Sequence, residues 1–220
     1  MSLRNKIVMA FTILVLLSIS SSIIVSYNIS SMKSNVKELS DVYFEGITSL
    51  LEGDRDSYQS NLALTQIMSL NDSEKINKLI TKGVSDNLIQ VKERFDSFKS
   101  GLSGDLSKDK SKFDEFEKYY SSTKDNTQKI IEFVNAQNIV AARDFYFNTY
   151  LKDYSSMRSV IDYFTDETYK IIDENKAQTS DLIELSLSIF WIISILTVLI
   201  TIVFSYVLGK NINNSIKKLQ

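Results

Sequence analysis

Two long uncharged apolar runs are the features that most constrain how this chain can fold. The first run covers residues 7–27 (IVMAFTILVLLSISSSIIVSY) and the second covers residues 185–209 (LSLSIFWIISILTVLITIVFSYVLG). At about 1.5 Å of rise per residue, each run forms a helix that can cross a hydrocarbon core of about 30 Å. Both runs are therefore predicted to be transmembrane helices, and the lipid bilayer is an expected partner.

The first run could instead be the core of a signal peptide, because Arg4 and Lys6 precede it and several serines lie near its end. It is longer than the roughly 7 to 15 apolar residues of a signal core, and it leads without a break into a helical pattern. We therefore favour an uncleaved membrane anchor.

Basic residues near the two runs predict how the chain crosses the membrane. They precede the first run and follow the second, and cytoplasmic flanks carry an excess of Lys and Arg. These residues are Arg4, Lys6, Lys210, Lys217 and Lys218. A two-pass protein of the cytoplasmic (inner) membrane is expected, with residues 1–6 and the C-terminal end in the cytoplasm. Residues 28–184 would lie outside, and whether that space is periplasm or extracellular stays open.

Composition excludes several classes of function. The 220 residues are 44% apolar and 24% charged with a net charge of −2, which fits an ordered protein without the basic surface of a nucleic-acid binder. Cys and His are absent, which removes thiolate nucleophiles, imidazole bases and almost all transition-metal sites. The sequence also lacks a phosphate-binding glycine loop and a nucleophile elbow. We therefore expect no enzyme activity, catalytic residue, cofactor, metal or nucleic-acid partner.

Apolar spacing predicts a first long helix that leaves the membrane and continues outward. From Ile29 to Leu51 the apolar residues recur every three or four positions. The segment SLNDSEK ends this helix, where Asn71 or Asp72 can cap the next one. A second helix is predicted from about residue 73 to residue 100.

Two further breaks complete the division into helices. GLSGDLSKD (residues 101–109) is a glycine-containing turn that ends the second helix, and NAQN (residues 135–138) separates a third helix from a fourth. The fourth helix passes directly into the second apolar run, and the chain contains no Pro to interrupt it. The prediction is an all-α fold, an up-down-up-down four-helix bundle with two transmembrane helices continuous with bundle helices 1 and 4.

The stretch LLEGDRDSYQSNLAL (residues 50–64) interrupts the apolar stripe of the first helix with polar side chains. At about 100° per residue, Asp54 and Asn61 fall on the stripe, Tyr58 lies near it, Arg55 flanks it and Asp56 points outward.

Asp54 and Arg158 lie about the same number of residues from the first and second apolar runs, so Arg158 of the fourth helix is expected at the same height in the bundle as Asp54. The same estimate of height places Gln90 and Tyr119 or Tyr120 near this level. A polar layer is predicted, which either fixes the register of the bundle or borders a ligand site.

A second group, AARDFYFNTYLKDYSSMR (residues 141–158), concentrates aromatic residues at the start of the fourth helix. Core packing accounts for some of them, whereas Phe145 and Phe147 are predicted to face a neighbouring subunit or a pocket. The same estimate of height places this group opposite the polar interruption of the first helix. The candidate ligand-binding residues are therefore Asp54, Arg55, Tyr58, Asn61, Tyr146, Tyr150, Tyr154 and Arg158.

With its tail GKNINNSIKKLQ, the chain resembles the sensory half of a bacterial methyl-accepting chemotaxis protein with a four-helix-bundle ligand-binding domain. DRDSYQ (residues 54–59) is similar to the Asp-Arg-Asp…Tyr-Gln pattern on the first bundle helix of many such receptors. Ile212, Ile216 and Leu219 resemble the opening apolar positions of a HAMP helix, although the proline usual near Ser215 is absent. Residues 210–220 are therefore expected to begin a HAMP linker.

The resemblance implies a homodimer that binds a small molecule, or a ligand-loaded binding protein, outside the membrane. Binding would displace the fourth helix slightly, and the second span would pass this movement to HAMP for chemotaxis signalling. A complete receptor would continue into a cytoplasmic half that contacts a kinase and its adaptor, so the chain is expected to be a truncated sensory module. Aspartate is not supported as the ligand, because Arg55 is the only arginine on the first extramembrane helix.

Alternative interpretations stay open. The same outer module could belong to a histidine kinase or a cyclic-dinucleotide enzyme, or it could be a structural membrane-tethered bundle. Neither the ligand nor its location, within the bundle or at a dimer interface, follows from the sequence.

Overall fold

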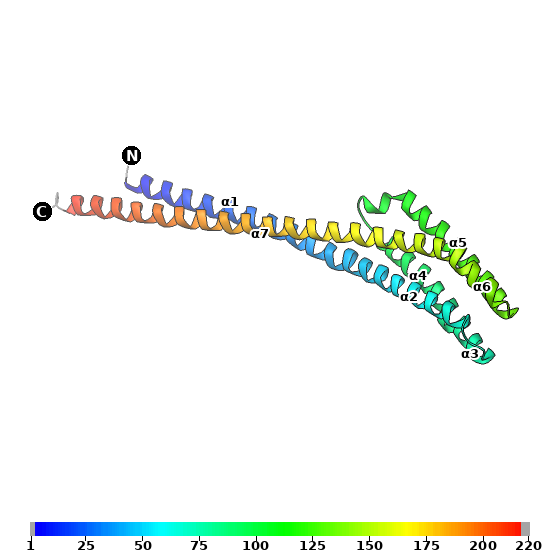
Figure 1. Cartoon of the computed structure of the whole chain (residues 1–220). Coiled ribbons are helices and arrows are strands. Elements are labelled where there is room, and N and C mark those ends of the chain that lie inside the picture. The colour runs from blue at the N-terminus through cyan, green and yellow to red at the C-terminus, as the bar shows by residue number, and fades with distance from the viewer. Residues whose placement is uncertain (1–2, 217–220) are drawn as a thin grey trace. The chain divides into compact units, whose positions relative to one another are not determined.

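A computed structural model describes residues 3–216, which form helices joined by short turns (Figure 1). The chain divides into two compact units. One unit comprises the segments up to Lys37 and from Asn175 onward, and the other comprises Glu38–Glu174. We call these the two-helix unit and the bundle unit.

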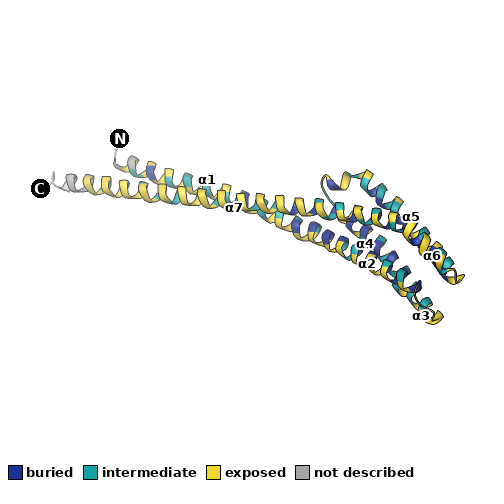
Figure 2. Cartoon of the chain, in the orientation of Figure 1, coloured by how far each residue is buried: buried dark blue, intermediate teal, exposed yellow. Residues whose placement is uncertain are grey.

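The two-helix unit consists of α1 (Leu3–Glu38) and the C-terminal part of α7 (Leu151–Ile216). Both helices are long and apolar enough to cross a membrane, and most of their apolar side chains are exposed (Figure 2). The amide of Asn28 donates to the hydroxyl of Ser186 at 2.9 Å. Such a contact joins helices in an apolar environment, where a polar group needs a protein partner.

The predicted HAMP start lies mostly beyond the part of the chain whose side chains are described. Lys217, Lys218 and Leu219 lie outside the described residues, and α7 continues as an α-helix to Ile216. The HAMP assignment of residues 210–220 therefore stays a prediction.

The bundle unit contains four helical rods separated by three chain reversals, which confirms the predicted all-α four-helix bundle. Rod one enters from α1 and continues through η1 (Leu39–Phe44) into α2 (Glu45–Ile67). Rod two comprises α3 (Ser73–Lys78), η2 (Leu79–Ser85) and α4 (Asp86–Gly101). After the short 3-10 turn η3 (Leu106–Lys108), rod three is α5 (Lys110–Asn135), and rod four comprises α6 (Ile139–Phe145), η4 (Tyr146–Tyr150) and α7.

Local chemistry sets the chain reversals. The carboxylate of Asp72 accepts from the backbone N–H groups of Glu74 and Lys75 at 3.1 and 3.2 Å, which caps rod two as one of the two predicted residues. Asn138 caps rod four in the same way, and Gln137 before it adopts φ 59°. Since a positive φ is uncommon outside glycine, this residue marks the sharp turn between rods three and four.

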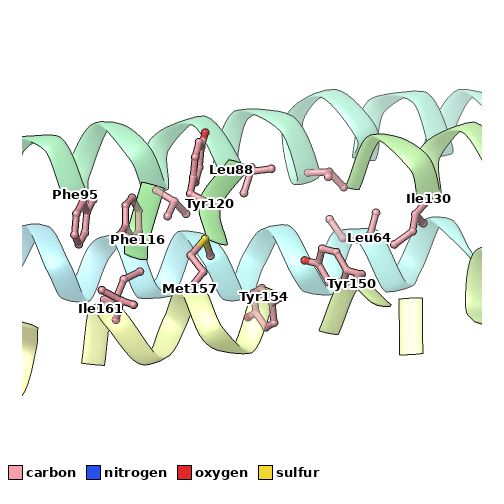
Figure 3. Packing of buried hydrophobic residues seen from close by; sticks show 14 of the residues in the cluster. Leu64, Leu88, Phe95, Phe116, Tyr120, Ile130, Tyr150, Tyr154, Met157 and Ile161 are labelled. Carbon is pink, nitrogen blue, oxygen red and sulfur yellow. The ribbon is translucent and has the colours of Figure 1, made fainter. Parts of the chain in front are cut away.

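Aromatic packing fills the half of the bundle nearest the turn at residues 102–109. Phe95 stacks on Phe116 with ring centroids 3.5 Å apart, and Phe113 stacks on Phe164 at 4.7 Å. Figure 3 shows Phe95 and Phe116 from rods two and three within the core cluster. A fully buried Phe contributes about 1.5 to 3 kcal/mol relative to exposure, so these rings are a main source of stability.

Small residues line the face of α2 that contacts rod two. A Cβ added at Gly83 would lie only 2.7 Å from the Cβ of Ala63, and one added at Gly46 would lie 3.2 Å from the Phe98 ring. Ser60 is also buried, and its hydroxyl donates to the backbone carbonyl of Val84 at 2.9 Å. Rods one and two therefore pack more closely than bulky side chains would allow.

This packing corrects the predicted inner face of rod one. Asp56, predicted to point outward, is 1% exposed, whereas Leu51 of the apolar stripe is 50% exposed. Gly53, Ser60 and Ala63 are also buried, and they lie on the same side of α2 as Asp56, where rod two packs against it. The inner face of α2 is therefore the side of these small residues, and Leu51 lies outside it.

Three segments within residues 3–216 form π-helical turns: η1 in rod one, η2 in rod two and η4 in rod four. Each contains an extra residue relative to an α-helix, and such turns occur frequently at functional sites. The contact of Ser60 with Val84 places η2 against α2, and a contact between Asn61 and Tyr146 places η4 there as well. Two π segments therefore meet α2 at one level, within its polar interruption.

Candidate functional site

Asp54 of rod one and Arg158 of rod four form an ion pair, as expected from their equal heights in the bundle. The Arg158 guanidinium donates from Nε to Oδ1 at 2.6 Å and from a terminal nitrogen to Oδ2 at 2.8 Å. Both side chains are partly buried, 27% and 34% exposed, and the carboxylate of Asp54 raises the pKa of Arg158. A bidentate contact of this kind fixes the relative orientation of the two side chains as well as the distance between them.

Asp56 forms a separate charged cluster on the other side of α2. Its carboxylate accepts from Nε of Arg94 at 2.6 Å and from Arg55 at 2.9 and 3.1 Å. Arg94 also pairs with Glu52. A buried carboxylate is tolerated only with such partners, and here they join rod one to rod two.

The height estimate from residue numbers missed Arg94, because it placed Gln90, one helical turn away, at this level of rod two. Arg55 is more than half exposed, and the structure places it on Asp56 rather than beside Asp54. The polar interruption thus serves two helix contacts, one toward rod four and one toward rod two.

Three tyrosines of rod four form a stacked ladder along the core. The rings of Tyr146 and Tyr150 lie 5.3 Å apart, and those of Tyr150 and Tyr154 lie 5.6 Å apart, both nearly parallel. The Tyr146 hydroxyl donates to Oδ1 of Asn61 at 3.0 Å, while Arg158 lies over the Tyr154 ring at 5.9 Å. The ladder therefore connects the two ends of the polar interruption on α2.

Burial raises the pKa of all three ladder tyrosines, because the charged phenolate is poorly solvated in the core. Asn61 lowers the pKa of Tyr146, and Thr127 lowers that of Tyr150, but the effect of burial is larger in both. The phenols are consequently neutral hydrogen-bonding groups at physiological pH.

Two buried hydroxyls near the ladder lack a hydrogen-bond partner within the described part of the chain. They are the Tyr154 phenol and the Thr123 hydroxyl of α5, although the Ser57 side chain lies near enough to the phenol to lower its pKa. The hydrogen bond from Asn126 to Asp153 sets rods three and four in antiparallel register, so these hydroxyls belong to the same region of the core. An unpaired buried hydroxyl lowers the stability of the folded state by roughly 1 to 3 kcal/mol. The polar groups in this region of the core therefore reduce the stability of the bundle.

The remaining aromatic candidates divide between core and surface. Phe145, predicted to face outward, packs on the core with its ring 6.0 Å from that of Phe133. Phe147 and Tyr58 are 66% and 57% exposed. The structure thus gathers Asp54, Asn61, Arg158 and the tyrosine ladder, and leaves Tyr58 outside this group.

Two cavities of the bundle unit contain none of the ladder tyrosines in their linings. One of about 560 Å³ lies between the chain reversals and is lined by amides that include Asn71, Asn77 and Asn135. Another of about 260 Å³ lies between rods two and three and reaches Thr127. Within the described residues, no group of three His, Cys, Asp or Glu side chains is arranged to hold a metal ion.

Comparison with protein families gives one match that covers most of the chain. The family model described as a four helix bundle sensory module for signal transduction matches residues 1–184. The chain belongs to this family. Searches of curated proteins and of solved structures give no match.

Membership of the sensory module family agrees with the geometry of the bundle unit. The match corresponds to the sensory region of methyl-accepting chemotaxis proteins, as the resemblance implied. A sensory module must hold its helices in a defined arrangement that a signal can bias. The Asp54–Arg158 pair and the tyrosine ladder join the first rod to the fourth, which are the two rods continuous with the apolar helices.

Proposed function

We propose that this sensory module is the outer part of a chemoreceptor, which binds a small molecule or a ligand-loaded binding protein outside the membrane. The observation that carries the proposal is the bidentate contact between Asp54 and Arg158. Arg158 belongs to α7, a single helix from Leu151 to Ile216. A change at this contact would therefore act on the same helix that forms the second apolar segment.

The signal would be a shift between two packings of rod four against rod one. A ligand biases such an equilibrium only when it binds one packing more tightly than the other. The second span would pass the displacement to a HAMP linker that begins near residue 210. The cytoplasmic kinase and adaptor would be reached through a C-terminal signalling half, and no chemistry on the ligand is expected.

The proposed membrane topology has both termini in the cytoplasm and residues 28–184 outside. Its support is the pair of helices that are apolar enough to span a membrane, together with Arg4 and Lys210 at their flanks.

We also propose that the module works as a homodimer through the outer face of rod one. Phe44, Leu51 and Tyr58 recur every seven residues and are 50% to 57% exposed, and Leu62 one turn later is 45% exposed. A seven-residue apolar repeat is the pattern by which one helix packs along another. A second copy offers the same stripe, so the two faces complement each other by symmetry.

The test of the sensing function uses the full chain in lipid nanodiscs and a hybrid that carries the signalling half of a methyl-accepting chemotaxis protein. Amino acids, organic acids and other small metabolites are screened for stabilisation, which reaches about 2.7 kcal/mol at a hundredfold excess over Kd. Active compounds are then assayed for a change in kinase output. The response is expected to be lost in Asp54→Ala and Tyr150→Ala, and retained in Lys129→Ala, whose ion pair with Glu132 is exposed.

A lack of response to every compound class, with dimers intact, would contradict small-molecule sensing and favour a protein partner or a structural tether. Kinase output that follows ligand binding would separate the chemoreceptor from a bundle that only binds.

A further inference from the structure

The cavity between rods two and three has the features of a small-molecule site. It encloses about 260 Å³, and its inner wall is made by Leu88 and Ile131, both 6% exposed, and by Tyr120 at 9%. At the roughly 30 Å³ that a water molecule occupies in the liquid, this space corresponds to about nine water-sized groups. The volume therefore suits a molecule of about ten non-hydrogen atoms.

The polar groups of the cavity are suited to an uncharged ligand. Lys124 and Asp125 line its edge with opposite charges, so the edge has no net charge. At the base, the hydroxyl of Thr127 donates to the carbonyl of Thr123 at 2.8 Å, which leaves the Thr127 oxygen able to accept a hydrogen bond. A charged ligand would lose its hydration against Leu88 and Ile131 without gaining a buried partner of opposite charge.

One π-helical segment lines this cavity, and a second contacts a lining residue from behind. Ser85, the last residue of η2, lines it directly. Thr127 lies against the phenol of Tyr150, the last residue of η4, and lowers its pKa. Since π turns occur frequently at functional sites, the position of η2 in the cavity wall is an argument separate from the cavity's shape.

We propose that this cavity binds a small uncharged molecule with an apolar body and one hydroxyl group that donates to Thr127. The ligand body lies on Leu88, Ile131 and the Tyr120 ring, and its hydroxyl reaches the base of the cavity. If the proposed sensory function holds, the ligand acts through Thr127 on Tyr150 and thus on the tyrosine ladder. Binding itself does not depend on that function.

The experiment compares four probes that share a phenyl ring and differ in their charged groups: benzyl alcohol with none, benzoate, benzylammonium and zwitterionic phenylalanine. Binding to the full chain in lipid nanodiscs is measured by saturation-transfer NMR and calorimetry. Benzyl alcohol is expected to bind at least tenfold more tightly than each charged probe. Equal or tighter binding of a charged probe or of phenylalanine would overturn the assignment of ligand class.

Matched variants separate the cavity from the lipid and from the fold. Ser85→Trp fills the cavity and is expected to abolish benzyl alcohol binding, whereas Ser97→Trp places the same ring on the exposed surface of α4 and should leave binding unchanged. Thr127→Val keeps the shape and is expected to weaken binding about tenfold. Circular dichroism establishes that each variant is folded, and binding by Ser85→Trp equal to that of the native chain would overturn the site.

The same variants keep this proposal distinct from the sensory one. Benzyl alcohol binding without a change in kinase output from the hybrid would contradict signalling from this cavity and support the site. Kinase responses to another ligand, with no benzyl alcohol binding, would overturn the site and leave the sensory function standing.

Discussion

Arg158 holds both carboxylate oxygens of Asp54, at 2.6 and 2.8 Å, across the contact between the first and fourth rods of the bundle. The two residues are 104 positions apart in the chain. They nevertheless lie about the same number of residues from the two apolar segments, which predicts the same height in the bundle. Because the helices run without a break, residue number serves as a measure of height.

Removal of this contact should cost moderate stability. Arg158→Met keeps the packing of the side-chain stem but leaves Asp54 without its partner, and we expect a loss of about 1 to 2 kcal/mol because both groups are partly exposed. Urea unfolding followed by circular dichroism measures the change. Lys170→Met, which breaks the exposed pair with Glu167, is the matched control and should change stability by less than about 0.5 kcal/mol. Equal effects of the two substitutions would contradict a special role for Arg158.

The cluster around Asp56 should be more sensitive, because that carboxylate is buried. Arg94→Met removes the partner from rod two, and the expected loss is about 2 to 4 kcal/mol, since a buried charge is left poorly compensated. The double variant Arg94→Met with Asp56→Asn should recover part of this loss. The same unfolding measurement applies, and failure of the double variant to recover stability would show that Arg94 acts through packing alone.

Gly83 should not tolerate even a methyl group. The Cβ of Gly83→Ala would lie 2.7 Å from that of Ala63, so overpacking should outweigh the gain in helix propensity and leave a net loss of about 1 to 2 kcal/mol. Gly101→Ala is the control, because an added Cβ there meets no atom within 4 Å and should stabilise by up to about 1 kcal/mol. Recovery of Gly83→Ala by Ala63→Gly would identify the clash.

Alkaline pH should destabilise the bundle through its tyrosine ladder. Burial raises the pKa of Tyr150 above its ordinary value of 10, so the folded state keeps its proton when the unfolded state loses it. Stability is therefore complete below about pH 10 and falls as pH rises above that value. Tyr150→Phe should reduce the slope between pH 10 and 12 by about 1.4 kcal/mol per pH unit.

The proposed dimer face can be tested by cysteine cross-linking, since the chain has no native cysteine. Leu51→Cys on the exposed stripe of α2 should form a disulfide between two copies in oxidised nanodiscs. Glu132→Cys, exposed on α5, should cross-link poorly. Gel electrophoresis without reductant distinguishes the outcomes, and equal cross-linking at both positions would contradict the assigned face.

The sequence predicted the four rods well because their ends carry strong local signals. Asp72 caps rod two and Asn138 caps rod four through their own side chains, and both segments were recognised from residue type alone. Long rods without proline then made the level of Asp54 and Arg158 predictable.

The inner face of rod one was harder to predict because its contact with rod two uses small residues. Gly53, Ser60 and Ala63 give no apolar signal, yet all are buried where α4 and η2 approach. Arg94 was missed for a related reason, since a surface arginine and one that reaches a buried Asp56 look alike in sequence. The seven-residue spacing of Gly46 and Gly53 was the signal that could have placed this face.

The π segment at Tyr146–Tyr150 also bears on how chains of this kind can differ in length. A π turn holds one residue more than the α turn it replaces, while the helix on either side stays in phase with its neighbours. Deletion of a single residue within 146–150 should therefore leave Arg158 facing Asp54 instead of rotating all of α7. Deletion of one residue can thus be accommodated at η1, η2 or η4 without altering the rods between them.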